Sequence, residues 1–278
     1  MPGLSFLRRG TKGEVSTMTR IEELFKRKQQ KVLNVYCTAG FPKLDSTLEV
    51  MKSLQDNGAD LIELGMPYSD PLADGEVIQQ SGAVALKNGM TIAKLFEQLK
   101  DMRNPNSPLG VRGIPVILMG YMNPVMQYGF ENFCAKAAEV GVDGLILPDL
   151  PMYEYESEYG AIIKKYNLNL IFLVTPETKE ERLVQIDKLS SGFLYAVSSS
   201  STTGNNKDIS EQEFYFKKLH DMPLKNPILV GFGIKDRPTF EAACKYTNGA
   251  IIGSAYIKAL ANGKDIQTAT KEFLQTII

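Results

Sequence analysis

The sequence is short of the side chains that most often build metal sites and disulfides. Its 278 residues include one histidine, His220, and three cysteines, Cys37, Cys134 and Cys244, which lie far apart with no Cys-x-x-Cys spacing. This pattern suggests neither a zinc site nor a disulfide framework. A lone histidine also argues against a Ser-His-Asp or Cys-His nucleophile. We therefore expect no metal, and a reducing, cytoplasmic location.

Long apolar runs and an excess of one charge are missing as well. No segment approaches the roughly 18 apolar residues that span a bilayer, and the net charge is −1. Because such a chain has no electrostatic footprint for nucleic acid or a membrane surface, we expect small molecules and proteins as its partners. Residues 1–17 precede Met18 and are expected to form a partly disordered N-terminal extension.

Short apolar runs alternate with amphipathic segments along the remainder. The expected strands cover residues 32–38, 61–63, 115–121, 144–147, 168–174, 193–197, 227–231 and 250–252. The expected helices behind them cover residues 47–57, 77–87, 92–103, 130–140, 155–166, 179–189, 211–220, 237–246 and 267–277. Eight strands, each followed by at least one helix, and an extra helix that begins after Thr19 predict an α/β fold. Residues 18–278 are therefore expected to form a single (β/α)₈ TIM barrel domain, with chemistry on the loops after the strands.

One loop carries most of the chemical information. Residues 63–75 read ELGMPYSDPLADG, and their prolines and glycines prevent a helix or strand from continuing through them. Glu63 ends the second expected strand and Asp74 follows eleven residues later. The two carboxyl groups could act as a general acid and its electrostatic partner. Spacing alone also allows a solvated strand-end acid and an ordinary helix N-cap.

Glycine-containing turns follow the last three expected strands. A Ser/Thr/Gly/Asn loop covers residues 198–206, the sequence GFGI covers 231–234 and the sequence GSA covers 253–255. Glycines at these points let backbone N–H groups approach an anion, and a helix N-terminus adds its positive end. Turns at the last two strands match the usual phosphate site of this fold, so the sequence predicts a bound phosphate group.

The loop at residues 63–75 closely resembles the signature of the tryptophan synthase α chain, ELG-x-P-[FY]-SDP-x-ADGP. The resemblance extends from about Ile21 to the C-terminus and includes YMNP at 121–124, PDLP at 148–151, and the GFGI and GSA turns. Members of that family cleave indole-3-glycerol phosphate to indole and D-glyceraldehyde 3-phosphate in L-tryptophan biosynthesis. The resemblance implies a carbon–carbon lyase that uses no cofactor of its own. It also implies a β chain that carries pyridoxal phosphate, in an α₂β₂ heterotetramer.

The resemblance also implies roles for individual residues. Glu63 would protonate the indole ring carbon, Asp74 would stabilise the charge developing on the indole N–H, and Tyr195 would lie in the same site. The positions that match the family's phosphate site are Gly204, Phe232, Gly233, Gly253 and Ser254.

Several further residues have less specific expectations. Three side chains at inward-facing strand positions could line an indole pocket or simply fill the barrel core: Tyr36, Met119 and Ile146. Asp70 resembles a residue at the contact with the β chain, although it could equally be a turn acid before Pro71. Asp149 is expected near the mouth of the active site, where a structural role through hydrogen bonds is at least as plausible as catalysis.

Two departures from the family pattern affect the site. Ser201 stands where the loop after the sixth strand usually has glycine, so the closing motion of this loop is in question. Glu76 stands where proline is common and adds a third acid.

Two other functions stay open. One is an aldolase or isomerase of another phosphosugar barrel, which would need a Schiff-base lysine or a different acid pair. The other is a regulatory subunit that binds a phosphorylated ligand and activates a partner.

Overall fold

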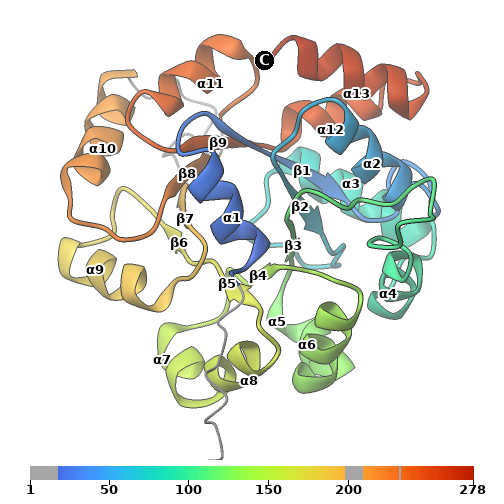
Figure 1. Ribbon diagram of the computed structural model, residues 1–278, viewed down its shortest axis with the longest axis horizontal. Helices are drawn as coiled ribbons and strands as arrows, with labels where there is room; N and C mark the ends of the chain where they lie inside the picture. The colour runs from blue at the N-terminus through green and yellow to red at the C-terminus, as the bar shows by residue number, and fades with distance from the viewer. Residues whose placement is uncertain (1–17, 198–208, 232) are drawn as a thin grey trace, which may run out of the picture.

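The computed structural model describes residues 18–197, 209–231 and 233–278. The expected extension at residues 1–17, the loop at 198–208 with Ser201 and Gly204, and Phe232 lie outside them. Within the described part, one parallel sheet has the strand order β5-β4-β3-β2-β1-β9-β8-β7-β6. The strands are β1 (Val32–Thr38), β2 (Leu61–Gly65), β3 (Val116–Met119), β4 (Gly144–Ile146), β5 (Asn169–Leu170), β6 (Leu173–Val174), β7 (Leu194–Val197), β8 (Ile228–Gly231) and β9 (Gly249–Ile252). Figure 1 shows the sheet curled into a ring inside a circle of helices.

The two ends of this sheet are halves of one extended segment, which closes the ring. β5 pairs with β4 and β6 pairs with β7. Between them, the N–H of Ile171 donates to the Leu145 carbonyl (3.0 Å), and the Phe172 carbonyl accepts from the N–H of Tyr195 (3.1 Å). The N–H of Phe172 bonds to the Ser190 hydroxyl (3.2 Å) instead of a backbone carbonyl, which interrupts the strand. The predicted eight-stranded barrel is therefore confirmed, with its fifth strand split.

Helices cover the outside of the ring because parallel strands bury both faces. They are α2 (Thr47–Asp56), α3 (Glu76–Lys87), α4 (Ile92–Leu99), α5 (Met122–Tyr128), α6 (Phe130–Glu139), α7 (Met152–Glu154), the π-helical turn η1 (Tyr155–Tyr159), α8 (Gly160–Lys165), α9 (Glu180–Leu189), α10 (Ile209–Asp221), α11 (Arg237–Cys244), α12 (Ser254–Leu260) and α13 (Ile266–Gln275). Every residue of β1 is buried, as this arrangement requires. Among the described residues, none of the helices could cross a membrane.

The predicted N-terminal helix is α1 (Arg20–Arg27), which lies across one end of the ring in Figure 1. Thr19 and Glu22 form a reciprocal capping box at its start, which satisfies two free backbone N–H groups. Its apolar face is buried, and Phe25 packs against Phe193 with 6.1 Å between ring centroids. Phe193 directly precedes β7, so α1 closes the end of the barrel where the strands begin.

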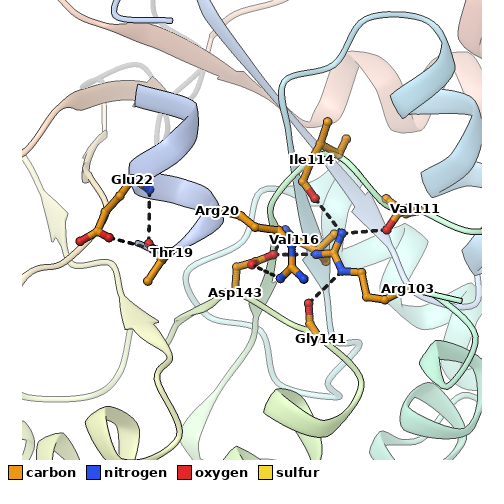
Figure 2. A network of polar contacts seen from close by, with 9 residues as sticks. All are labelled: Thr19, Arg20, Glu22, Arg103, Val111, Ile114, Val116, Gly141 and Asp143. Carbon is orange, nitrogen blue, oxygen red and sulfur yellow. Dashed lines mark hydrogen bonds and ion pairs between the residues drawn. The ribbon is translucent and has the colours of Figure 1, made fainter. Parts of the chain in front are cut away.

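A buried carboxylate fixes α1 to the barrel at the same end, as Figure 2 shows. Asp143 precedes β4 and forms ion pairs with Arg20 of α1 (2.7 Å) and with Arg103 (2.6 Å). It also accepts a hydrogen bond from the Val116 N–H at the start of β3 (2.8 Å). The Arg103 guanidinium donates in addition to the carbonyls of Gly141, Val111 and Ile114. Burial lowers the pKa of Arg103 to about 10, while Asp143 opposes this change.

The predicted elements differ from the structure in several places. β2 continues past Glu63 to Gly65, since Gly65 still pairs with Met119 of β3. α4 ends at Leu99 instead of residue 103, and Arg103 joins the Asp143 network from the turn that follows. α5 and α12 were not predicted. The start of α5 is hidden by Pro124, which the first turn of a helix tolerates because the N–H groups there have no partner within the helix.

Candidate active site

A cavity of about 440 Å³ lies toward the C-terminal ends of the strands. It is lined by residues of β1, β2, β3, β7 and β9, and by the segments that follow β2, β8 and β9. Eight of the residues proposed from the sequence line it together: Tyr36, Glu63, Asp74, Met119, Tyr195, Gly233, Gly253 and Ser254. The structure therefore brings these residues together at the strand ends and on the segments that follow them.

Glu63 lies at the inner wall of this cavity on β2. Its residue is only 1% exposed, and its carboxylate accepts a hydrogen bond from the side-chain amide of Asn34 on β1 (3.1 Å). Burial raises the pKa of Glu63 to about 8; the Asn34 bond lowers it in part and the nearby Asp74 charge raises it. Glu63 can therefore hold a proton near neutral pH, as a general acid must.

Asp74 is half-buried in the loop between β2 and α3. The N-cap of α3 is Gly75, which makes no side-chain capping bond, so the alternative reading of Asp74 as a helix cap is wrong. Instead its carboxylate hydrogen-bonds with the Tyr121 hydroxyl, which also accepts from the N–H of Ala73 (3.0 Å). Burial raises the pKa of Asp74 to about 6, and the Tyr121 bond opposes this rise.

Two tyrosines complete the polar part of the cavity. The ring of Tyr36 on β1 lies over Gly65, where an added Cβ would be 1.9 Å from the phenol oxygen. The ring of Tyr195 on β7 covers Gly231 in the same way, with the phenol oxygen 2.4 Å from an added Cβ. Burial raises the pKa of Tyr195 well above its usual value, and the charges of Glu63 and Asp74 raise it further. Tyr195 therefore keeps its proton and faces the acid pair as a neutral phenol.

The proposed phosphate-binding turns lie on the β8–β9 side of the cavity. Gly233 has a φ of +77°, a left-handed conformation that favours glycine, while Gly253 and Ser254 lie at the start of α12. Lys235 and Lys258 also line this part of the cavity, and no described carboxylate pairs with either. Neither lysine was predicted as a site residue, because neither directly follows a strand. The signal was present, since Ser254 and Lys258 are four residues apart and share one face of a helix.

The apolar lining differs from the expected indole pocket in one residue. Met119 of β3 lines the cavity, whereas Ile146 is buried in β4 and does not belong to the lining. The other apolar side chains come from Ile78, Ile234 and Ile251. They were not singled out in the sequence, because apolar residues at these positions look the same whether they fill the core or face a cavity.

The remaining acids around the strand ends lie outside the cavity lining. Asp149 is exposed, and both of its carboxylate oxygens accept from the N–H of Met122 (3.0 Å each), so it caps α5. This is the structural role that the sequence left open for it. Asp70 is exposed and hydrogen-bonded to the Ser69 hydroxyl. Glu76 begins α3 and accepts from the Gln80 side chain (3.0 Å).

The cavity thus combines two different environments. On the β2 side, two neighbouring carboxyl groups have pKa values of about 8 and about 6, so one holds a proton while the other is ionised near neutral pH. On the β8–β9 side are two ammonium groups and a glycine turn, which suit an anion. The arrangement can protonate one end of a molecule, stabilise positive charge there, and hold a phosphate at the other end.

The fold and this cavity define the class of (β/α)₈-barrel proteins with a ligand site at the C-terminal ends of the strands. The sequence model for "Tryptophan synthase alpha chain" matches residues 23–277. The chain belongs to the tryptophan synthase alpha chain family. This confirms the resemblance that the signature loop indicated.

Individual relatives agree with this assignment. The tryptophan synthase alpha chain of Bacteroides thetaiotaomicron is 48% identical over 91% of this chain and 96% of its own length. That of Christiangramia forsetii is 50% identical over 87% and 92%. Among solved structures, tryptophan synthase subunit alpha from Legionella pneumophila superposes with a TM-score of 0.83 at 33% identity, covering 94% of this chain and 97% of its own. The A-subunit from Pyrococcus furiosus gives 0.79 at 34% identity, covering 90% and 98%.

Proposed function

We propose that this chain acts as the α subunit of tryptophan synthase, a lyase that cleaves indole-3-glycerol phosphate to indole and D-glyceraldehyde 3-phosphate. Family membership over residues 23–277 supports this function. The observation that carries the site assignment is the pairing of a buried, protonatable Glu63 with Asp74 in a cavity whose other side is cationic.

The reaction needs two proton movements and one broken bond. Glu63 donates its proton to the indole ring carbon that bears the glycerol chain, and the ring nitrogen becomes positively charged. The ionised Asp74 stabilises that charge. Glu63, now a carboxylate, takes the proton from the adjacent glycerol hydroxyl as the carbon–carbon bond breaks. The bonding electrons return to the indole ring and a carbonyl forms on the phosphorylated fragment, so atoms and charge balance.

The other lining residues hold the substrate for these steps. Gly233, Gly253 and Ser254 are proposed to bind the phosphate, with Lys235 and Lys258 supplying positive charge. Tyr195, a neutral phenol facing both acids, is proposed to orient the reacting end. Met119 and Tyr36 are proposed to line the indole slot together with Ile78. Gly204 and Phe232 remain proposals, since they lie outside the described residues.

As a tryptophan synthase alpha chain, this protein has a β chain as its partner. We propose an α₂β₂ assembly, with pyridoxal phosphate carried by the β chain, and a cytoplasmic location. The rim formed by the segments after β2, β3 and β4 supports a docking surface there, because it exposes Leu72 (94%), Met126 (45%) and Tyr153 (79%). Large apolar side chains exposed on neighbouring segments are typical of protein contacts. Asp70 lies in the same loop as Leu72 and is proposed to contribute polar specificity.

The positions of Lys235 and Lys258 argue against the alternative function, a Schiff-base aldolase. Both line the cavity, but both side chains are exposed. A Schiff-base lysine is normally activated by desolvation in an apolar pocket or by a neighbouring cation. Their position at the anion side therefore favours binding over covalent catalysis.

The direct test is indole release from indole-3-glycerol phosphate by the purified chain, with and without a tryptophan synthase β chain. We expect indole in both cases and a higher rate with the β chain. If a folded chain binds glycerol phosphate but releases no indole under either condition, the regulatory function is correct instead. Inactivation by borohydride in the presence of substrate would point to a Schiff-base aldolase.

A further inference from the structure

The side chain of Asn34 stands out among the buried polar groups of the barrel. It lies on β1 and is fully buried, two residues before Tyr36 on the same, inward face of the strand. Its Nδ2 donates to Oε2 of Glu63 over 3.1 Å. Among the described residues, no other side chain or backbone group hydrogen-bonds to the Glu63 carboxylate.

The other end of the Asn34 amide has no such partner. Its Oδ1 atom is buried and accepts no hydrogen bond from the described residues. A buried acceptor without a donor is costly and is uncommon in native structures. Asn34 does not line the cavity itself, so contact with the substrate does not explain its presence.

The two protonation states of Glu63 explain why the Asn34 amide has a bonded Nδ2 and an Oδ1 without a donor. An ionised carboxylate only accepts hydrogen bonds, whereas a protonated carboxyl group has an O–H to donate. A half-turn of the Asn34 amide about its Cβ–Cγ bond exchanges Nδ2 and Oδ1. We infer that Asn34 is a positioning residue for Glu63, whose amide bonds the carboxyl group in both of the protonation states that it adopts during turnover. This inference rests on the proposed role of Glu63 in the lyase reaction.

The groups that face Glu63 come from three other places in the site. Tyr36 and Cys37 lie on β1, Tyr195 lies on β7, and Asp74 follows β2. Burial raises the pKa values of both tyrosines and of Cys37, so these groups stay neutral at physiological pH. Among the described residues, Asp74 is then the one facing group that carries charge. The Asn34 bond, which favours the ionised form of Glu63, opposes the effect of Asp74.

The test is the pH dependence of indole release by Asn34→Leu, which keeps the side-chain shape and removes both polar atoms. Because the charge-assisted bond to the carboxylate is stronger than the bond to the protonated carboxyl group, loss of both should move the alkaline limb of the pH–kcat profile upward by about one pH unit. The lost orientation should lower kcat about 10-fold. KM should stay within twofold, since Asn34 does not line the cavity. A merely structural role would leave the limb in place.

Asn169→Leu is the matched control. Asn169 is also a buried asparagine of the barrel with an unpartnered Oδ1, but it lies on β5 and makes no contact with Glu63. The Asn169→Leu substitution should change the unfolding free energy of the protein without shifting the alkaline limb of the pH–kcat profile. If Asn34→Leu does not fold, Asn34→Asp keeps the volume and places a second carboxyl group beside Glu63, which should move the limb further upward.

The outcomes separate this inference from the proposed function. An active wild-type chain whose alkaline limb is the same in the Asn34 variants overturns the role of Asn34 alone. A folded wild-type chain that releases no indole at any pH overturns the lyase function itself.

Discussion

The Tyr121 hydroxyl joins Asp74 to the N-terminus of α5. It hydrogen-bonds with the Asp74 carboxylate and accepts from the N–H of Ala73, and Tyr121 is itself the N-cap residue of α5. Asp149 holds the next residue, Met122, by its backbone N–H. The second acid of the site is therefore held by the segment that follows the neighbouring strand β3, and not only by its own loop.

Removal of this hydroxyl should change the acid side of the pH profile. The Tyr121 bond lowers the pKa of Asp74, so Tyr121→Phe should raise that pKa above about 6. More Asp74 is then protonated at pH 6–7, and kcat/KM should fall there while it approaches the wild-type value near pH 7.5. Tyr68→Phe is the control, since the ring of Tyr68 packs 5.4 Å from Tyr121 but its hydroxyl bonds Asn123. Equal profiles for the two variants would contradict the role of Tyr121.

Glu63→Gln should reduce indole formation by at least about 100-fold, the low end of general acid–base effects. The amide has nearly the same size as the carboxyl group, so the fold should be retained, which circular dichroism can verify. Glu76→Gln is the control because Glu76 begins α3 and does not line the cavity. Turnover near the wild-type rate in Glu63→Gln would disprove the assignment of the acid.

The same substitution should make stability less sensitive to pH. Because the folded-state pKa of Glu63 is about 8, against its usual 4.5, the fold favours the protonated form. The unfolded chain loses this proton at lower pH than the folded chain, so wild-type stability should fall as pH rises from about 4.5 to 8. At 1.36 kcal/mol per pH unit, the loss relative to Glu63→Gln should reach about 5 kcal/mol at most. Urea unfolding at pH 5 and pH 9 measures it, and a constant difference would contradict the buried, protonated state.

Because Lys235 and Lys258 line the phosphate side of the cavity, we expect their removal to weaken substrate binding without slowing the chemical step. Lys235→Gln and Lys258→Gln should each raise KM for indole-3-glycerol phosphate about 5- to 10-fold at low salt, with kcat within twofold. The effect should shrink as salt is added, because both ammonium groups are exposed. Lys271→Gln on α13 is the control, since this exposed lysine does not line the cavity. A large loss of kcat in either variant would instead support covalent catalysis.

We expect removal of the Asp143 carboxylate to lower the stability of the fold without lowering the catalytic rate. Asp143→Ala leaves Arg103 as a largely buried cation without its carboxylate, which should cost about 3 kcal/mol of unfolding free energy, the low end for a buried pair. Glu131→Ala breaks the exposed pair with Lys165 and should cost less than about 1 kcal/mol. Both variants should keep kcat per folded molecule, because neither residue lies near the cavity. Urea titration and active-site-normalised rates provide the two measurements.

The sequence predicted the repeating architecture because each strand is a compact apolar run and each helix has a regular apolar stripe. The start of α1 at Thr19 and the range of β1 were predicted correctly, since capping residues and β-branched runs are local signals. α5 was not found because Pro124 reads as a helix breaker. The split of the fifth strand depends on the Ser190 hydroxyl, whose approach to Phe172 is a tertiary contact.

In the site too, residues that share one segment were predicted from the sequence, whereas contacts between distant segments were not. Glu63 and Asp74 were recognised because they share one loop with a distinctive sequence. Asn34 and Tyr121 are separated from their partners by 29 and 47 residues, and only the pairing of β1, β2 and β3 brings them together. The strand position of Ile146 allowed either the pocket or the barrel core. The structure shows that Ile146 belongs to the buried packing of β4.

The interrupted fifth strand divides the ring into two arcs, β1–β5 and β6–β9. Inside each arc, neighbouring strands share continuous ladders, but the arcs meet at the β1–β9 ladder and at a single covalent crossing at Ile171 and Phe172. At this crossing the covalent backbone continues the ring in place of a ladder between two strands. Glu63 and Asp74 belong to the first arc and Gly233, Lys235 and Lys258 to the second, so each arc supplies one of the two proposed ends of the substrate site.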